Sequence, residues 1–176
     1  MADEQSSTSA EKQLASYFAK YEPAMAKLGK ILRAKLRKRL PGLSEIVYVY
    51  ESQSSLVISY SPTENGYDAV CTLALYPSLV KLFFTGGPQL SKADPKKLLK
   101  GSGKMVRYVE LSSAADFDRA EIEALMTAAL KLAKPLPDAN AKGSVIIKAE
   151  AQKERARRTK KTARKAAPRG KVKVRR

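Results

Sequence analysis

The stretch that decides the fold covers residues 67–111 and reads YDAVCTLALYPSLVKLFFTGGPQLSKADPKKLLKGSGKMVRYVEL. It begins with two apolar segments, residues 67–76 and 79–85, and only a turn around Pro77 separates them. Apolar side chains alternate along the second segment, which is typical of a strand that buries one face. Because so short a turn joins antiparallel neighbours, we expect a hairpin here. After a long connection, residues 104–111 are expected to form a further strand.

Two more strands are expected before this stretch. Residues 45–51 are rich in Val and Tyr, and residues 55–60 alternate apolar and polar side chains. Asn65 and Gly66 then favour a tight turn, because both tolerate a positive φ at little cost. Short connections of this kind predict five strands that pair in an antiparallel sheet.

Helices are expected on both sides of these strands. Apolar residues recur at helical spacing in residues 14–21, 25–36 and 122–133. Asp118 and Glu121 form a capping-box-like pair at the start of the last helix. We therefore predict an α+β fold in which a five-stranded antiparallel sheet has helices packed on one face.

The domain organisation follows from composition. We expect a disordered N-terminus at residues 1–10, an α+β domain at residues 11–134 and a linker at residues 135–147. Residues 148–176, called the basic tail below, are rich in Lys, Arg and Ala without an apolar face, which predicts a disordered segment or a fluctuating helix.

Charge is distributed unevenly along the chain, whose net charge is +17. Residues 1–141 carry 19 Lys and Arg against 15 Asp and Glu, a net charge of +4. Residues 142–176 carry 15 against 2, a net charge of +13. Such an excess favours polyanions, because each Lys or Arg beside a phosphate releases a counterion and adds affinity without sequence preference.

The main functional prediction is therefore a non-enzymatic protein that binds DNA or RNA, or another polyanion, through its tail. A solubilising tail without a specific partner is the alternative interpretation of the same charge. The basic face of the second helix is expected to assist binding. The candidate polyanion-binding residues are Lys153, Arg155, Arg157, Arg158, Lys160, Lys161, Arg164, Lys165, Arg169, Lys171, Lys173, Arg175, Arg176, Lys27, Lys30, Arg33 and Arg37.

A glycine loop is the second candidate site. Gly101, Ser102, Gly103 and Lys104, followed by Arg107, could cradle a small anion with successive backbone N–H groups and two cationic side chains. The spacing of a Walker loop is absent. The same glycines also fit a plain helix stop and strand entry. An enzyme that binds a phosphorylated ligand at this loop is one alternative function.

Four carboxylates gather at the start of the last helix: Asp116, Asp118, Glu121 and Glu123. They are weak candidates for holding Fe²⁺ or Mg²⁺. Helix capping and favourable interaction with the helix dipole are the favoured explanation of these carboxylates. From the residues alone we expect no cofactor.

Catalytic chemistry is not indicated. The chain contains no His, so the usual Ser/His and Cys/His pairings are missing, and its one cysteine, Cys71, is expected in the core. A single cysteine also fits a reducing compartment. Tyrosines on the predicted strands could stack on bases or simply pack the sheet.

With no signal peptide or spanning segment apparent, we expect a soluble, cytoplasmic protein without membrane insertion.

Several motifs resemble the YdhG-like family, a family of domains of unknown function. They are Phe83-Phe84-Thr85-Gly86-Gly87 at a strand end, Leu98-x-x-Gly101-x-Gly103-Lys104-x-x-Arg107, Asp116-Phe117-Asp118 at a helix entry and Leu40-Pro41-Gly42 at a helix end. The resemblance covers roughly residues 14–134. It implies a frataxin-like α-β-α sandwich, and because one bacterial member is described as an iron chaperone, it makes an intracellular iron-binding chaperone another alternative function.

Overall fold

The structure is a computed structural model that describes residues 2–135, 138 and 140–148, with side chains described from residue 8 onward. Its helices and strands, with three short 3₁₀ helices, are α1 (Ala2–Phe18), α2 (Pro23–Arg39), β1 (Ser44–Tyr50), η1 (Glu51–Gln53), β2 (Ser55–Ser61), η2 (Gly66–Asp68), β3 (Cys71–Leu75), β4 (Val80–Thr85), η3 (Gly87–Ala93), β5 (Val106–Leu111), α3 (Ala114–Phe117), α4 (Ala120–Leu132) and β6 (Val145–Ile147).

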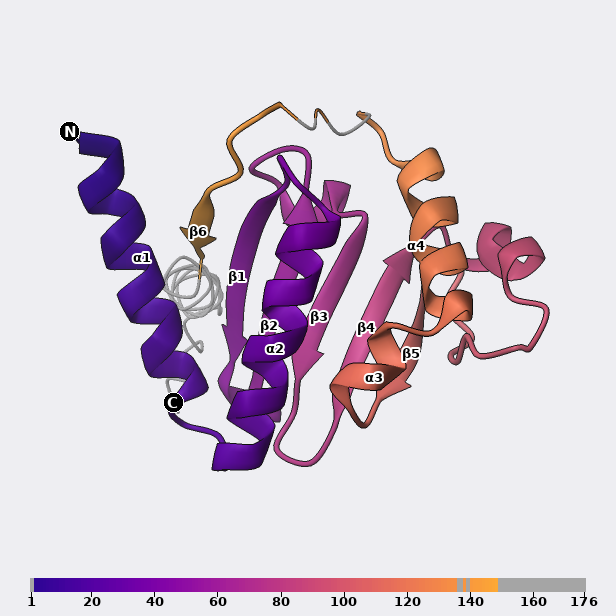
Figure 1. Cartoon of the computed structure of the whole chain (residues 1–176), viewed down its shortest axis with the longest axis horizontal. Coiled ribbons are helices and arrows are strands. Elements are labelled where there is room, and N and C mark those ends of the chain that lie inside the picture. Colours follow the sequence, from indigo (N-terminus) through magenta and orange to yellow (C-terminus); the bar gives the residue numbers. More distant parts are fainter. Residues whose placement is uncertain (1, 136–137, 139, 149–176) are drawn as a thin grey trace, which may run out of the picture.

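The strands form one mixed sheet in the order β5-β4-β3-β2-β1-β6. The five strands from β1 to β5 pair with their sequence neighbours in antiparallel fashion, whereas β6 runs parallel to β1. Helices α2 and α4 lie on the same face of this sheet (Figure 1). The α+β class is therefore confirmed, and the number of strands is corrected from five to six.

The register of the central strands places their largest apolar side chains on the face that the helices cover. In β4, Val80, Leu82 and Phe84 are fully buried. Their partners on β3 are Leu75, Leu73 and Cys71, which are equally buried. Burial of such side chains contributes roughly 1.5–3 kcal/mol each, so this alternation stabilises the sheet and fixes which face the helices pack against.

Helix α2 lies very close to the sheet at Gly29. A Cβ atom at this position would stand 2.2 Å from a methyl carbon of Leu75 on β3 and 2.9 Å from the ring of Phe18 on α1. A larger residue would push the helix away from both neighbours. The glycine thus brings α1, α2 and β3 into one core, with Leu32 and Leu36 buried beside it.

The N-terminal residues predicted to be disordered belong to a helix, because α1 begins at Ala2. Leu14 and Phe18 anchor its C-terminal half in the core. Once these turns are fixed, adding residues costs little, and the preceding Ala, Glu and Gln residues have good helix propensity. The prediction of a disordered N-terminus is therefore wrong for residues 2–10.

The predicted capping box was placed a few residues away from the observed one. The capping box is formed by Ser113 and Asp116 at the start of α3, whereas α4 begins after Arg119 without a side-chain cap. Asp94 directly follows η3, and its carboxylate accepts hydrogen bonds from the backbone N–H groups of Leu98 and Leu99.

The predicted linker contains the sixth strand. Val145, Ile146 and Ile147 pair with residues 45–47, so the end of the predicted linker extends the sheet. A Cβ atom at Gly143 would stand 2.1 Å from the carbonyl oxygen of Leu43, so only glycine allows the chain to approach β1 this closely.

Candidate functional site

The basic helix α2 is partly neutralised by carboxylates from other elements. Arg33 is only 14% exposed and lies between Glu11 of α1 and Glu45 of β1, with its Nη2 atom 2.8 Å and 2.6 Å from their carboxylate oxygens. Burial alone would lower the pKa of Arg33, but hydrogen bonds to both glutamates outweigh it and raise the pKa. Arg37 also donates to Glu11, at 2.9 Å.

These ion pairs revise the list of polyanion-binding candidates. Arg33 donates through all three nitrogens of its guanidinium group to glutamates, so it is a structural residue of the core edge. Arg37 is half exposed but already paired. Lys27 and Lys30 form no ion pair with any residue whose side chain is described. Of the four α2 candidates, these two are available to a phosphate.

The candidates from Lys153 to Arg176 lie outside the described residues. Lys148, the last described residue of the chain, donates from its backbone N–H to the carbonyl oxygen of Val47, at 2.8 Å. The basic tail therefore starts at the edge of the sheet, immediately beyond β6.

The glycine loop is exposed and leads into β5. Arg107 turns its guanidinium group onto the loop itself and donates to the carbonyl oxygens of Gly101 and Gly103. Its cationic group is thus used to hold the loop, and it does not stand free beside the backbone N–H groups of Ser102 and Lys104. This arrangement matches the strand-entry interpretation of the glycines.

The first two carboxylates of the acidic group have separate structural roles. Asp116 accepts hydrogen bonds from the backbone N–H groups of Ser113 and Ser112, both at 2.8 Å, and these bonds lower the pKa of Asp116. Asp118 pairs with Lys35 of α2 at 2.7 Å. The two side chains therefore cap α3 and join it to α2.

The remaining two carboxylates are also paired with lysine or arginine. A hydrogen bond from Lys96 lowers the pKa of Glu121 to about 2. Glu123 binds Arg39 of α2, and that hydrogen bond lowers the pKa of Glu123. Among the described residues, no three Asp, Glu, Cys or His side chains come together in a way that could hold a metal ion.

Cys71 and Tyr60 are both fully buried in the core, which confirms the prediction for Cys71. Burial raises the pKa of the Cys71 thiol, which opposes a nucleophilic role. Tyr60 is fully buried, and within the described part of the chain its hydroxyl has no hydrogen-bond partner. Burial, followed by the nearby Glu45 carboxylate, raises the pKa of Tyr60. Tyr60 is therefore excluded as a stacking residue, in contrast to Tyr67, which is 93% exposed.

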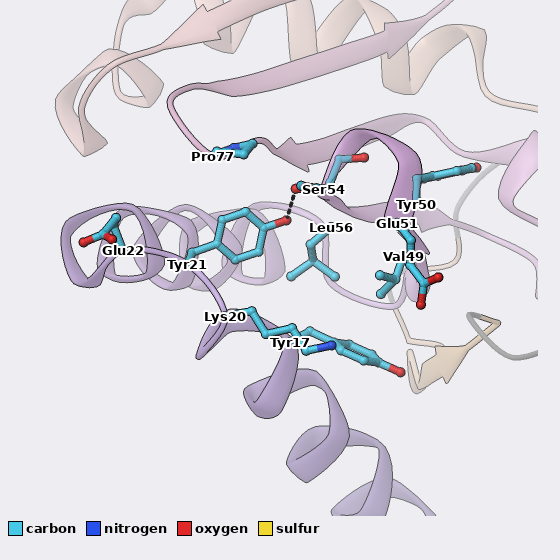
Figure 2. A pocket seen from close by; sticks show the side chains of 11 residues that line it. Tyr17, Lys20, Tyr21, Glu22, Val49, Tyr50, Glu51, Ser54, Leu56 and Pro77 are labelled. Atoms are coloured by element: carbon cyan, nitrogen blue, oxygen red, sulfur yellow. Dashed lines mark hydrogen bonds between the residues drawn. The ribbon is translucent and has the colours of Figure 1, made fainter.

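A cleft of about 410 Å³ was not foreseen from the sequence. It forms where the end of α1 and the α1–α2 connection face η1 and the neighbouring ends of β1 and β2 (Figure 2). Its lining residues are Tyr17, Lys20, Tyr21, Glu22, Val49, Tyr50, Glu51, Ser54, Ser55, Leu56 and Pro77. Three separate stretches of the sequence build it, residues 17–22, residues 49–56 and Pro77, so no local motif could have indicated it.

Tyr21 connects the two sides of this cleft. Its hydroxyl lies 2.9 Å from the carbonyl oxygen of Ser54 (Figure 2) and 3.2 Å from that of Leu75. Burial raises the pKa of Tyr21, so the hydroxyl stays protonated and donates. Ser54 adopts a left-handed φ of 47°, an uncommon conformation for serine that this bond helps to hold.

The cleft also combines aromatic and charged groups. The ammonium group of Lys20 lies 5.5 Å from the centre of the Tyr17 ring, within the range of a cation–π interaction. Ser55 is 1% exposed, and no described group serves as hydrogen-bond partner of its hydroxyl. A buried polar group without a partner destabilises the fold, which makes this part of the lining a candidate for ligand contact.

The fold and the cleft define an α+β protein with a mixed six-stranded sheet and a tyrosine-lined cleft at one end. No family model matches the chain, and comparison with curated proteins and with solved structures found no match either. Among the described helices, none has the length and apolar character needed to cross a bilayer.

Proposed function

We propose that this protein binds nucleic acid, or a polyanion of similar charge density, through its basic tail and without enzymatic chemistry. The supporting observation is that the domain pairs many of its own cations. Glutamates hold Arg33, Arg37 and Arg39, and Lys35 pairs with Asp118. The sequence of residues 149–176, by contrast, holds 13 Lys and Arg and only 2 Glu.

The cations of the domain and those of the tail differ in how readily a phosphate can reach them. An ion pair inside the domain gains nothing from a phosphate, because the cation would have to leave its carboxylate. A cation in a sequence almost without acids has no such competitor nearby along the chain. Counterion release from the phosphates then supplies the affinity, and it predicts weak sequence preference.

The resemblance to the YdhG-like, frataxin-like family remains part of this proposal and rests on the sequence motifs alone. An iron-binding role is not carried further, because each of Asp116, Asp118, Glu121 and Glu123 is engaged in a separate cap or ion pair. A phosphate site at the glycine loop is also set aside, since Arg107 is bonded to the loop carbonyls.

Removal of residues 149–176 tests the proposal. We expect the affinity for a duplex DNA and for a structured RNA to fall by roughly a hundredfold or more at moderate salt, because most of the counterion release is lost. Fluorescence anisotropy measures the affinity. Circular dichroism and thermal unfolding check that the shortened chain keeps its fold, and binding that survives in a folded truncated chain contradicts the proposal.

A further inference from the structure

The direction of β6 determines where the basic tail leaves the domain. Val145 to Ile147 pair in parallel with residues 45–47 of β1, and the backbone N–H of Lys148 donates to the carbonyl oxygen of Val47. The chain therefore leaves the sheet toward the C-terminal end of β1. Val49, Tyr50 and Glu51, which lie at that end, line the cleft.

The distance is short enough for the tail to reach the cleft. Val49 lies two residues beyond Val47 on β1, and Glu51, the first residue of η1, lies four residues beyond it, which corresponds to at most about 7 and 13 Å at the rise of a strand. The first basic residue after Lys148 is Lys153, followed by Arg155. Five residues of extended chain span up to about 17 Å. Lys153 and Arg155 are thus within reach.

The chemistry of the cleft suits a cationic side chain. The carboxylates of Glu22 and Glu51 and the rings of Tyr17 and Tyr21 belong to the lining of the cleft, and the two carboxylates stand at opposite ends of it (Figure 2). Lys20 is the one cation among the lining residues, and its ammonium group already lies over the Tyr17 ring. Aromatic rings beside carboxylates attract guanidinium and ammonium groups. Since Lys20 is exposed, it can turn into solvent when a second cation enters.

We propose that the cleft binds a guanidinium or ammonium group from residues 153–158, so that the start of the basic tail docks on its own domain. Arg155, Arg157 and Arg158 supply guanidinium groups, which stack on tyrosine rings better than ammonium groups do. Two carboxylates cannot neutralise the 13 cations of residues 149–176, so most of the tail remains available to a polyanion. Nucleic acid and the cleft compete for the first few cations.

Paramagnetic relaxation in the full chain tests the docking. A spin label is placed in the tail with Ala156→Cys, and Cys71, which is fully buried, leaves the new thiol as the accessible one. We expect the amide signals of Tyr21, Glu51 and Ser54 to broaden strongly relative to a diamagnetic label. Broadening no greater than at Glu110, on the distant strand β5, overturns the proposal.

Charge variants in the labelled chain separate the cleft from general attraction. Glu51→Gln should weaken the broadening, and Lys20→Gln should strengthen it, because the two changes alter the charge of the cleft in opposite directions. Glu110→Gln is the matched control, since it removes an exposed carboxylate far from the cleft, and it should change nothing. Equal effects of Glu51→Gln and Glu110→Gln contradict a specific contact.

A mixed sample identifies the source of the cation. Chain that carries the spin label but no ¹⁵N is mixed with ¹⁵N-enriched chain that carries no spin label. No broadening is expected in the ¹⁵N-enriched chain if each tail docks on its own domain. Broadening in the mixture shows that another copy supplies the cation, which overturns the proposal. The two proposals can fail separately. If the protein does not bind nucleic acid, the broadening at the cleft is still expected. If the tail does not dock, the broadening is absent while nucleic-acid binding is retained.

Discussion

Helix α2 and residues 149–176 have nearly the same density of positive charge, but their surroundings differ. The 17 residues of α2 include seven Lys and Arg and no acid. Carboxylates from α1, β1 and α4, and that of Asp118 directly after α3, nevertheless neutralise Arg33, Lys35, Arg37 and Arg39. Residues 149–176 have 13 Lys and Arg with two Glu in their own sequence. Basic composition alone therefore does not define a polyanion site, because the fold decides which cations are available.

The largest effect on stability is expected at Arg33, the most buried cation of α2. Arg33→Met leaves the carboxylate of Glu45, only 3% exposed, with the more distant Arg37 at 3.9 Å in place of its close partner, and should lower the free energy of unfolding by about 3–5 kcal/mol. Urea denaturation measures the change. The matched change Arg164→Met, in the tail but outside residues 153–158, should leave the unfolding curve where it is.

Two controls sharpen this prediction. Arg39→Met breaks a more exposed pair of the same helix and should cost at most about 1 kcal/mol. Adding Glu45→Met to Arg33→Met should recover much of the loss, because the unpaired buried charge disappears. If Arg33→Met lowers the free energy of unfolding no more than Arg39→Met does, the ion pairs of Arg33 with Glu11 and Glu45 do not have the structural role inferred for them.

A smaller effect is expected on lowering the pH. Hydrogen bonds from Arg33 and Arg39 lower the pKa of Glu11 and Glu123 below the ordinary value of 4.5. Their contribution is complete above about pH 4.5 and is lost as the pH falls through the lower pKa of the folded state. The urea midpoint should thus be constant from pH 7 to 5 and decrease toward pH 3. A midpoint that stays constant or rises toward pH 3 is incompatible with these ion pairs.

The strands of the meander were predictable because their signals are local. Alternating side chains around Leu82, the turn at Pro77 and the apolar segment before it specify neighbouring pairs. The ion pairs of α2 were not predictable in the same way. Asp118 and Glu123 follow their partners Lys35 and Arg39 by 83 and 84 positions, so only the packed helices bring them together.

Neither strand β6 nor the cleft was predicted from the sequence, and the physical reason is the same for both. Three residues of β6 carry too little pattern to reveal a partner, and the hydroxyl groups of Ser44 and Ser144 that meet at its start are 100 positions apart. The residues that line the cleft, from Tyr17 to Pro77, lie in separate stretches of the sequence that come together only once the sheet has formed. Long-range pairing, rather than local propensity, decides both features.

The smallest effect is expected for the two α2 lysines that resemble tail residues. Lys27→Gln and Lys30→Gln together should change the free energy of unfolding by less than about 0.5 kcal/mol, since neither lysine pairs with a described side chain. The affinity for duplex DNA should fall only slightly and mainly at low salt. A loss of affinity comparable to removal of residues 149–176 would move the binding site from the tail to α2.

The salt dependence of binding tests the central claim most directly. Six tail cations are replaced by Gln at once, namely Arg155, Arg157, Arg158, Lys160, Lys161 and Arg164, and the logarithm of the duplex-DNA affinity is plotted against that of the salt concentration. If all six contact phosphates, the slope should become less steep by about 5. A slope equal to that of the unaltered chain would contradict the account, because the tail cations would then take no part in binding.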